Sequence, residues 1–346
     1  LMRAAVLTRR SWIEILEHKI PPTDRDEVRV RIKAGGICGS DIHYYQHYKM
    51  GDFPVREPFI LGHEAAGVVE TVGENVKDLQ NGDLVVVNPS HPCKNCSYCF
   101  SGRELLCADM RFLGSSRKFP HIQGMFSQIF TTERSQCFKL PSNLSLHHAA
   151  FAEPLAVAMH AVQNAGALIG ANVLISGAGP IGCLILMVTR LGGANTVTIT
   201  DIKKEPLRVA ENIGATRALD ISQSVDQLPL TGDPRGSFDV AFEASGNGDA
   251  VMQAIKNLKP GGTFVQVGTF QNTNISIPSD VIMTKELTLK SSFRFDKEFS
   301  WAAEYLASQR INVEPLLSHV FPMEEANEAF QLAQDRTKAM KIHLAF

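Results

Sequence analysis

The glycine-rich turn at residues 177–182 constrains the fold of this chain more than any other feature. Its sequence, Gly177-Ala-Gly-Pro-Ile-Gly182, fits the pattern G-x-G-x-x-G. The pattern also occurs in unrelated loops. Here, however, a buried strand is predicted at 173–176, an apolar helix at 180–191, and a second strand at 196–200 just before Asp201. A strand, a glycine turn, a helix and a second strand in this order form the unit that binds a dinucleotide.

Each residue of the turn has a predicted role in binding the cofactor. Gly177 permits the tight turn, Gly179 lets the backbone approach a pyrophosphate, and Gly182 allows the helix to pack closely on the strand. The helix begins with Pro180 and Ile181, and its unpaired N–H groups then face the phosphates. A nucleotide-free α/β domain with a glycine-rich turn is the alternative interpretation.

Asp201 bears on which dinucleotide would bind. Its carboxylate can accept hydrogen bonds from an adenosine ribose and would repel a 2′-phosphate, which favours NAD over NADP. Lys203 and Lys204 follow directly. Either lysine could sit beside a 2′-phosphate, although a solvated helix start is the simpler interpretation. NAD is therefore the predicted cofactor, and NADP stays open as an alternative.

The alternation of strands and helices from about residue 148 predicts the fold class. The six predicted strands lie at residues 173–176, 196–200, 216–219, 238–242, 263–267 and 287–290. Helices are predicted between them, at 205–213 and 249–258 among others, and a turn at 259–262. This order is typical of a doubly wound parallel sheet in an α/β fold.

The first half of the chain is β-rich instead. Strands are predicted at 28–32, 66–72 and 83–87, with frequent glycine and proline between them, as in a small barrel or sandwich. After residue 292 the chain has predicted helices at 297–309 and 323–334 and a short strand at 341–344.

Seven cysteines are distributed very unevenly, and their clustering indicates metal. Four of them, Cys93, Cys96, Cys99 and Cys107, lie within fifteen residues. Four thiolates with short spacers can close a tetrahedral Zn²⁺ site and leave no open position, so the predicted role is structural. An iron–sulfur cluster, four free thiols and a zinc ribbon that binds nucleic acid are the alternatives. Cys137 and Cys183 are expected to be buried thiols.

Composition excludes some partners. Lys+Arg 34 against Asp+Glu 36 gives a formal charge of -2, which does not suggest a nucleic-acid surface. The longest apolar stretch, residues 181–188, is far below the roughly 18 residues that a membrane span requires. No signal segment is apparent at the N-terminus. We therefore expect a cytoplasmic protein that acts on a small molecule, with no nucleic acid and no membrane as partner.

Three further strings, far apart in the sequence, contain potential metal ligands. They are Gly35-Gly-Ile-Cys-Gly-Ser-Asp-Ile-His43, Gly62-His-Glu64 and Ala152-Glu-Pro-Leu155. Taken singly, Cys38 could be a core thiol, His63 a loop histidine and Glu153 a carboxylate at a helix N-terminus. Spacing alone does not show that these residues meet.

In combination these strings resemble a known family. The G-H-E around His63, the four-cysteine segment and the glycine turn are similar to those of zinc-dependent medium-chain alcohol dehydrogenases, over the whole chain. Residues 37–44 and 151–156 resemble the polyol dehydrogenase branch. Residues 107–112, 119–121, 175–185 and 292–295 are most similar to members that oxidise L-idonate at C5 to 5-ketogluconate.

The resemblance implies a second, catalytic zinc ion. Cys38 and His63 would be ligands, and Glu153 stands where many alcohol dehydrogenases have a second cysteine. Glu64 would be a ligand or a close neighbour of the ion. One thiolate, one imidazole and carboxylate oxygen suit Zn²⁺ with an open position. The implied total is one catalytic and one structural zinc ion per chain.

The resemblance also implies further site residues. Ser40 would take the proton of the substrate hydroxyl and His43 would pass it to water, while Val267, Gly268 and Arg294 would lie beside the cofactor. Arg294, Arg111 and Lys118 are candidates for a substrate carboxylate, which an arginine could bind in a bidentate pair. A neutral polyol such as sorbitol or xylitol is the alternative substrate, and a non-catalytic NAD-binding relative is a third hypothesis. The branch often has an arginine five residues after the ribose-binding acid, where this chain has Pro206.

The domain organisation follows from the same resemblance. A GroES-like catalytic domain with the zinc sites would comprise 1–147 and 292–346, and a Rossmann domain, 148–291, would be inserted into it. Substrate would bind in the cleft between the domains. A homo-oligomer, dimer or tetramer, is expected.

Overall fold

The structure is a computed structural model that describes all residues except 225–227, 229–233 and 271–273. It divides into two compact units. The first unit comprises Leu1–Glu153, Phe299–Asp335 and Lys341–Phe346, and the second comprises Pro154–Glu298 and Arg336–Met340. The segment 336–340 thus belongs to the second unit, although it precedes the last strand of the first.

The second unit contains the predicted doubly wound sheet. Among the described residues its strands run parallel in the order β15-β14-β13-β16-β17-β18. Their bounds are β13 Asn172–Ser176, β14 Thr196–Asp201, β15 Arg217–Asp220, β16 Phe238–Glu243, β17 Leu258–Gln266 and β18 Thr288–Ser291. The chain runs outward from β13 first to one edge and then, from β16, to the other. The strand order therefore reverses between β13 and β16, where such sheets bind ligands at their carboxyl edge.

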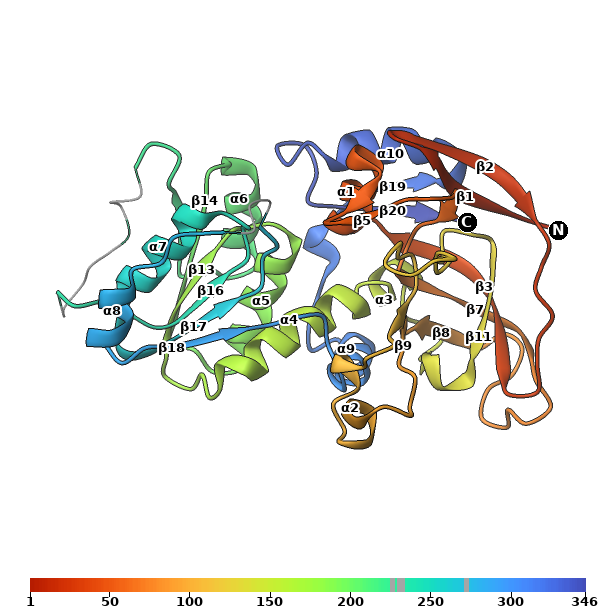
Figure 1. Cartoon of the computed structure of the whole chain (residues 1–346), viewed down its shortest axis with the longest axis horizontal. Coiled ribbons are helices and arrows are strands. Elements are labelled where there is room, and N and C mark those ends of the chain that lie inside the picture. The colour runs from red at the N-terminus through yellow and green to blue at the C-terminus, as the bar shows by residue number, and fades with distance from the viewer. Residues whose placement is uncertain (225–227, 229–233, 271–273) are drawn as a thin grey trace. The chain divides into compact units, whose positions relative to one another are not determined.

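Helices α5 Pro180–Leu191, α6 Lys204–Asn212 and α7 Gly248–Asn257 pack on this sheet, and α8 Ser279–Thr284 packs against α7 (Figure 1). Helix α4, Ala152–Ala165, precedes β13 in the chain. α5 has the predicted bounds because Pro180 suits the first helical position and Gly192 follows the last. The expected turn at 259–262 lies instead inside β17. The register passes there from Leu258 directly to Thr263, and Gly261 has φ +75, so the strand contains an irregularity where a turn was predicted.

The first unit is built on a mainly antiparallel sheet in the order β12-β8-β7-β3-β20-β19, with β11 also paired to β3. The bounds are β3 Glu27–Gly36, β7 Glu64–Val72, β8 Leu84–Val87, β11 Ile129–Glu133, β12 Cys137–Leu140, β19 Leu317–Pro322 and β20 Lys341–Ala345. The last strand pairs with β3, which places His343 opposite Gly36, and Gly36 also faces Glu64 on β7. Residues of the C-terminal strand therefore lie next to the G-H-E string.

Shorter elements complete the first unit. The strands are β1 Met2–Arg9, β2 Trp12–His18, β4 Lys49–Met50, β5 Phe53–Pro54, β6 Phe59–Ile60, β9 Ser90–His91 and β10 Arg111–Phe112. The helices are α1 Gly39–His47, α2 Ser97–Phe100, α3 Leu146–Ala149, α9 Glu298–Ala307 and α10 Ala326–Ala333. Valines and isoleucines of β3 and β8 are fully buried in the core that supports these elements.

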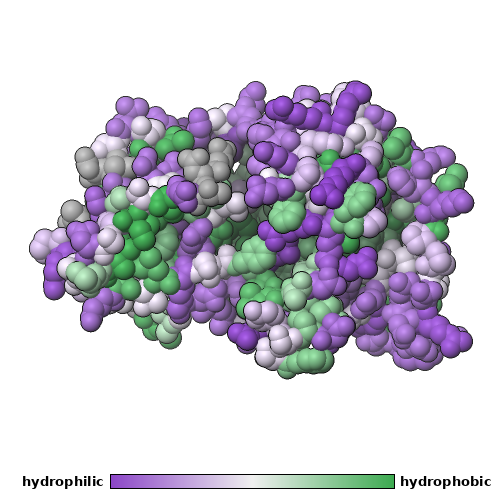
Figure 2. Space-filling view, in the orientation of Figure 1, coloured by the Kyte–Doolittle hydropathy of each residue, from purple (hydrophilic) through white to green (hydrophobic). Residues whose placement is uncertain are grey.

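The surface in Figure 2 is largely hydrophilic, with separate hydrophobic patches. Exposed apolar side chains of the second unit include Ile277, Met283 and Leu289, and Leu289 lies on the edge strand β18. An exposed edge strand can pair with another chain, but the expected homo-oligomer stays a prediction. Within the described ranges, every helix is too short or too polar to cross a membrane.

Candidate metal centres and nucleotide site

Three residues of the predicted catalytic zinc site come together in the first unit. One ligand atom each from Cys38, His63 and Glu64 lies within 4.8 Å of the others. Cys38 is the residue before α1, His63 precedes β7, and Glu64 begins that strand. The chain turns sharply before His63, because Gly62 has φ +97 and a Cβ atom there would lie 2.3 Å from the ring of Phe126. The backbone thus turns the histidine and the glutamate toward Cys38.

Asp41 joins two of these residues, and the sequence analysis did not single it out. Its Oδ2 accepts a hydrogen bond from the backbone N of Cys38 at 3.0 Å, and its Oδ1 lies 3.7 Å from Nδ1 of His63. Asp41 is fully buried, and burial raises the pKa of its carboxyl group although His63 opposes the shift. A carboxylate behind a ligating histidine fixes the orientation of the ring. Its position as third residue of α1 was the available signal.

Lys341 holds Glu64, and sequence reasoning missed this contact as well. Nζ donates to Oε1 of Glu64 at 2.7 Å and lies 2.5 Å from Oε2, and both side chains are buried. Burial alone would lower the pKa of Lys341, but the Glu64 carboxylate outweighs it and the pKa is raised. Gly36 must lack a side chain here, because a Cβ atom would lie 2.2 Å from Oε2 of Glu64.

Glu153 is buried in the first turn of α4, but it is not part of the group within 4.8 Å. Burial raises the pKa of Glu153 to about 8, with His63 opposing and with Glu64 and Cys38 adding to the shift. Burial and Glu64 likewise raise the pKa of Cys38 to about 11. A thiolate and carboxylates that repel one another in a buried site are the donor set that a divalent cation would stabilise. The residues present therefore fit zinc.

Ser40 and His43 lie on the same helix, α1, directly after Cys38. The nearby Ser40 hydroxyl acts to lower the pKa of the Cys38 thiol, against the larger effect of burial, so this side chain lies close to the metal cluster. His43 is half-buried, its ring centroid is 4.6 Å from that of His47, and burial and His47 together lower its pKa. The two predicted proton carriers are thus about one helical turn apart on α1, with Ser40 nearer to Cys38 and His43 beside His47.

The four clustered cysteines also meet, with one sulfur atom from each within 4.8 Å of the others. The Cys96 and Cys99 sulfurs are 3.6 Å apart, close to the roughly 3.8 Å edge of a tetrahedron with Zn–S bonds of about 2.3 Å. Backbone N–H groups of Cys93 and Asp109 donate to the Cys107 sulfur at 3.1 and 3.3 Å. N–H groups that point at sulfur stabilise thiolates. The geometry fits a closed Zn²⁺ site.

The glycine turn of the second unit has the geometry that a dinucleotide needs. Gly177 has φ +98, and a Cβ on Gly182 would lie 1.9 Å from the carbonyl oxygen of Gly177, so neither residue can be replaced without strain. Gly179 differs, because a Cβ there would meet only Nη2 of Arg336, at 3.9 Å, among the described residues. Pro180 and Ile181 begin α5 directly after Gly179. The turn therefore leaves room for phosphates at the helix N-terminus.

Asp201 ends β14 beside this turn, and its carboxylate already has hydrogen-bond partners. Oδ1 accepts from the backbone N of Ile202 at 2.7 Å and of Lys203 at 3.0 Å. Oδ2 accepts from the backbone N of Ala178 at 2.8 Å and from Nη2 of Arg336 at 2.6 Å. The ribose-binding role predicted for Asp201 did not anticipate an arginine in this position.

Val267 and Gly268 lie at the same carboxyl edge, after β17. Their backbone N atoms donate to the carbonyl oxygen of Glu243 at 2.9 and 2.8 Å. Oε1 of Glu243, which is fully buried, accepts from the backbone N atoms of Ser245 and Gly246 at 2.7 and 2.9 Å. A Cβ on Gly177 would lie 2.9 Å from the backbone N of Ser245. Glu243 therefore fixes the loops next to the glycine turn, a role that the sequence analysis missed.

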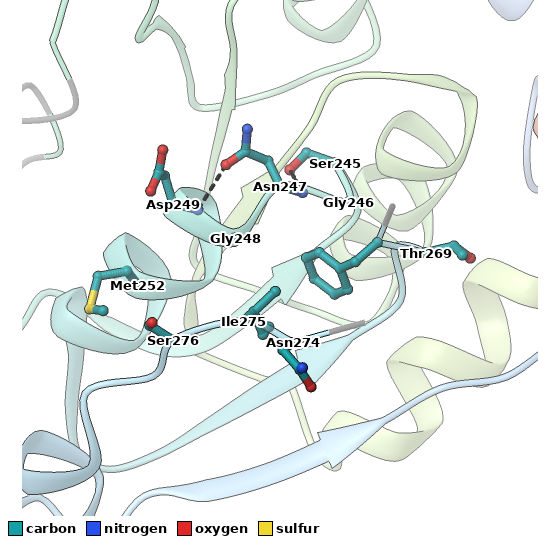
Figure 3. A pocket seen from close by; sticks show the side chains of 11 residues that line it. Ser245, Gly246, Asn247, Gly248, Asp249, Met252, Thr269, Asn274, Ile275 and Ser276 are labelled. Carbon is teal, nitrogen blue, oxygen red and sulfur yellow. Dashed lines mark hydrogen bonds between the residues drawn. The ribbon is translucent and has the colours of Figure 1, made fainter. Parts of the chain in front are cut away.

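A cavity of about 650 Å³ opens beside these loops (Figure 3). It is lined by residues after β16 and β17 and by the start of α7, including Ser245, Asn247, Met252, Thr269 and Ile275. Asn247 caps α7 by accepting from the backbone N of Asp249 at 2.8 Å. The cavity lies along the carboxyl edge where a doubly wound sheet binds its ligand.

The three cations predicted for a substrate carboxylate have different surroundings in the structure. Lys118 forms an ion pair with Asp109. Phe112 lies near His63, with ring centroids 5.4 Å apart, and strand alternation directs the neighbouring Arg111 the other way. Arg294 belongs to the second unit, where its guanidinium lies 4.7 Å from the ring centroid of Phe293.

Family models match both parts of the chain. An alcohol dehydrogenase GroES-like domain matches residues 24–142, and a zinc-binding dehydrogenase domain matches residues 180–308.

Individual relatives cover nearly the whole chain. L-idonate 5-dehydrogenase (NAD(P)(+)) of Escherichia coli K12 is 40% identical over 92% of this chain and 91% of its own. Its crystal structure superposes with a TM-score of 0.93 at 38% identity, covering 100% of this chain and 98% of its own. D-xylulose reductase A of Aspergillus oryzae is 36% identical over 89% of this chain and 86% of its own. A zinc-binding dehydrogenase of Sinorhizobium meliloti bound to NADP is 31% identical with a TM-score of 0.91, covering 100% and 99%.

These matches agree with the folds of both units and with the two clusters of potential metal ligands in the first unit. The chain belongs to the zinc-binding dehydrogenases that carry an alcohol dehydrogenase GroES-like domain.

Proposed function

We propose that this chain is a zinc-dependent, NAD(P)-dependent oxidoreductase that oxidises a secondary hydroxyl of a sugar acid, L-idonate, to give 5-ketogluconate. The observation that carries the proposal is the meeting of Cys38, His63 and Glu64 in a chain that also has an intact dinucleotide turn. A non-catalytic relative would have no reason to keep this buried set of ligands.

The residues of the first unit would hold the ion as follows. Cys38 and His63 would be direct ligands, and Asp41 would orient His63. Lys341 contacts both oxygens of Glu64 and would keep this carboxylate beside the ion, and Glu153, whose pKa responds to His63 and Glu64, would add a further carboxylate near them. The bound metal would polarise the substrate hydroxyl as a Lewis acid, and NAD(P) would accept the hydride.

A proton must leave the substrate hydroxyl. Ser40 lies at the Cys38 thiol and can accept this proton while its own hydroxyl proton moves on. His43 receives it one turn further along α1. Burial, together with His47 and Lys49, lowers the pKa of His43, which favours the neutral imidazole and the release of the proton to water.

L-idonate is proposed because of similarity rather than an identified carboxylate site. The E. coli L-idonate 5-dehydrogenase is a relative over most of the chain, and the residues at 107–112 and 292–295 resemble those of enzymes that act on this substrate. The second candidate is a neutral polyol of the sorbitol or xylitol type, because fungal D-xylulose reductases are almost as similar.

Steady-state kinetics on L-idonate, sorbitol and xylitol, each with NAD⁺ and NADP⁺, test the proposal. We expect kcat/KM to be at least about tenfold higher for L-idonate, a difference of about 1.4 kcal/mol in transition-state binding. A higher kcat/KM for sorbitol or xylitol than for L-idonate would show that the substrate is a neutral polyol and not the sugar acid. The Cys38→Ser variant is the control for contaminating dehydrogenases.

A further inference from the structure

Arg336 binds Asp201, the residue predicted to distinguish NAD from NADP. Its Nη2 lies 2.6 Å from Oδ2 of Asp201, whose own side chain is only 2% exposed. With Ala178, Ile202 and Lys203 as the other donors, the carboxylate accepts four hydrogen bonds. Four is about the number that a carboxylate can accept. A ribose hydroxyl can therefore reach Asp201 only if one of these donors leaves.

Arg336 is the donor that can leave. The other three are backbone N–H groups fixed by the glycine turn and by the end of β14. The Arg336 side chain is 43% exposed and comes from the separate segment 336–340. Within the described ranges, its other guanidinium nitrogens have no hydrogen-bond partner. The guanidinium can thus change partner without disturbing the fold.

The position of the guanidinium suits a phosphate. Nη2 lies 3.9 Å from the position that a Cβ atom on Gly179 would have. Gly179 is the residue of the turn around which there is free space for a ligand. An arginine there neutralises Asp201, which alone would repel a 2′-phosphate, and it still has N–H groups to offer. Arginine binds phosphate oxygens in charge-assisted, often bidentate hydrogen bonds.

We propose that Arg336 is the specificity-determining residue that admits the 2′-phosphate of NADP beside Asp201. With NADP the guanidinium stays near Asp201 and binds the phosphate. With NAD it must leave so that the ribose hydroxyls can donate to Asp201. This inference rests on the proposed binding of a dinucleotide at the glycine turn.

Calorimetric titration of the full chain with NADP⁺ and NAD⁺ tests this role without using catalysis. For Arg336→Gln we expect the Kd of NADP⁺ to rise at least about tenfold, while the Kd of NAD⁺ stays the same or falls. Arg336→Lys keeps the charge but not the planar fork, so its Kd for NADP⁺ should lie between those of the wild type and Arg336→Gln. Arg208→Gln, which removes an exposed arginine of the same unit on α6, is the matched control and should change neither Kd.

Adenosine 2′,5′-bisphosphate and adenosine 5′-monophosphate isolate the contribution of the 2′-phosphate. Arg336→Gln should weaken binding of the bisphosphate alone. Equal weakening of both nucleotides, or no change in either, would overturn the inference. A wild-type chain that binds NAD⁺ but not NADP⁺ would also overturn it and leave the proposed function standing, whereas a chain that binds neither would overturn both.

Discussion

Replacing Cys38 by serine is expected to reduce kcat/KM by at least about a thousandfold. Lewis-acid stabilisation by a metal ion contributes several kcal/mol, and each 1.36 kcal/mol corresponds to a factor of ten. Serine is a poor zinc ligand, so the variant should lose the ion at the cluster with His63 and Glu64. The fold should persist, because Cys38 precedes α1 and serine is favoured at that position. Turnover of the preferred substrate and the thermal transition are the measurements.

Cys137→Ala provides the matched control. Cys137 is a buried thiol in the core of the same unit, and within the described residues no metal-binding group includes it. Removing it should lower stability and leave kcat/KM within about twofold of wild type. Retained activity in Cys38→Ser would show that the cluster is not the catalytic centre.

Replacing Lys341 by methionine should lower the free energy of unfolding of the first unit by about 3–5 kcal/mol. The change leaves the Glu64 carboxylate buried without its partner, and breaking one side of a buried ion pair typically costs this much. Both tryptophans, Trp12 and Trp301, belong to this unit. Their fluorescence during urea unfolding therefore reports on the unit that contains the substitution.

The double variant Lys341→Met with Glu64→Gln distinguishes two causes of a lower free energy of unfolding, the unpaired buried charge and the loss of packing by the lysine side chain. It removes the buried carboxylate as well, so most of the lost stability should return. A single variant as stable as the wild type would contradict a buried ion pair. So would a double variant that is less stable than the single one.

The fold could be predicted from the sequence where local signals suffice. Helix α5 was predicted to the residue because proline and glycine mark its ends. The alternation of strands and helices after residue 148 correctly predicted the doubly wound sheet. The pairing of β20 with β3 could not be predicted, because strand partners far apart in the sequence leave no local pattern. The irregular start of β17 was mistaken for a turn because proline and two glycines occur there.

The site was predictable only in part, because contacts between residues far apart in the sequence leave no local pattern. Cys38, His63 and the four clustered cysteines have sequence motifs around them that are typical of metal ligands. Lys341 and Arg336 do not, because a lone lysine in a terminal strand and an arginine in a loop usually face solvent. Their roles follow from tertiary contacts with Glu64 and Asp201.

Zinc content per chain, measured by elemental analysis of the purified protein, tests directly whether the chain has a catalytic metal site as well as a structural one. Two clusters of ligands fit zinc, one with Cys38, His63 and Glu64 and one with four cysteines. We expect two zinc ions per wild-type chain and one in Cys38→Ser. A single ion in the wild type that Cys38→Ser retains would confine zinc to the four-cysteine cluster and contradict the proposed catalytic centre.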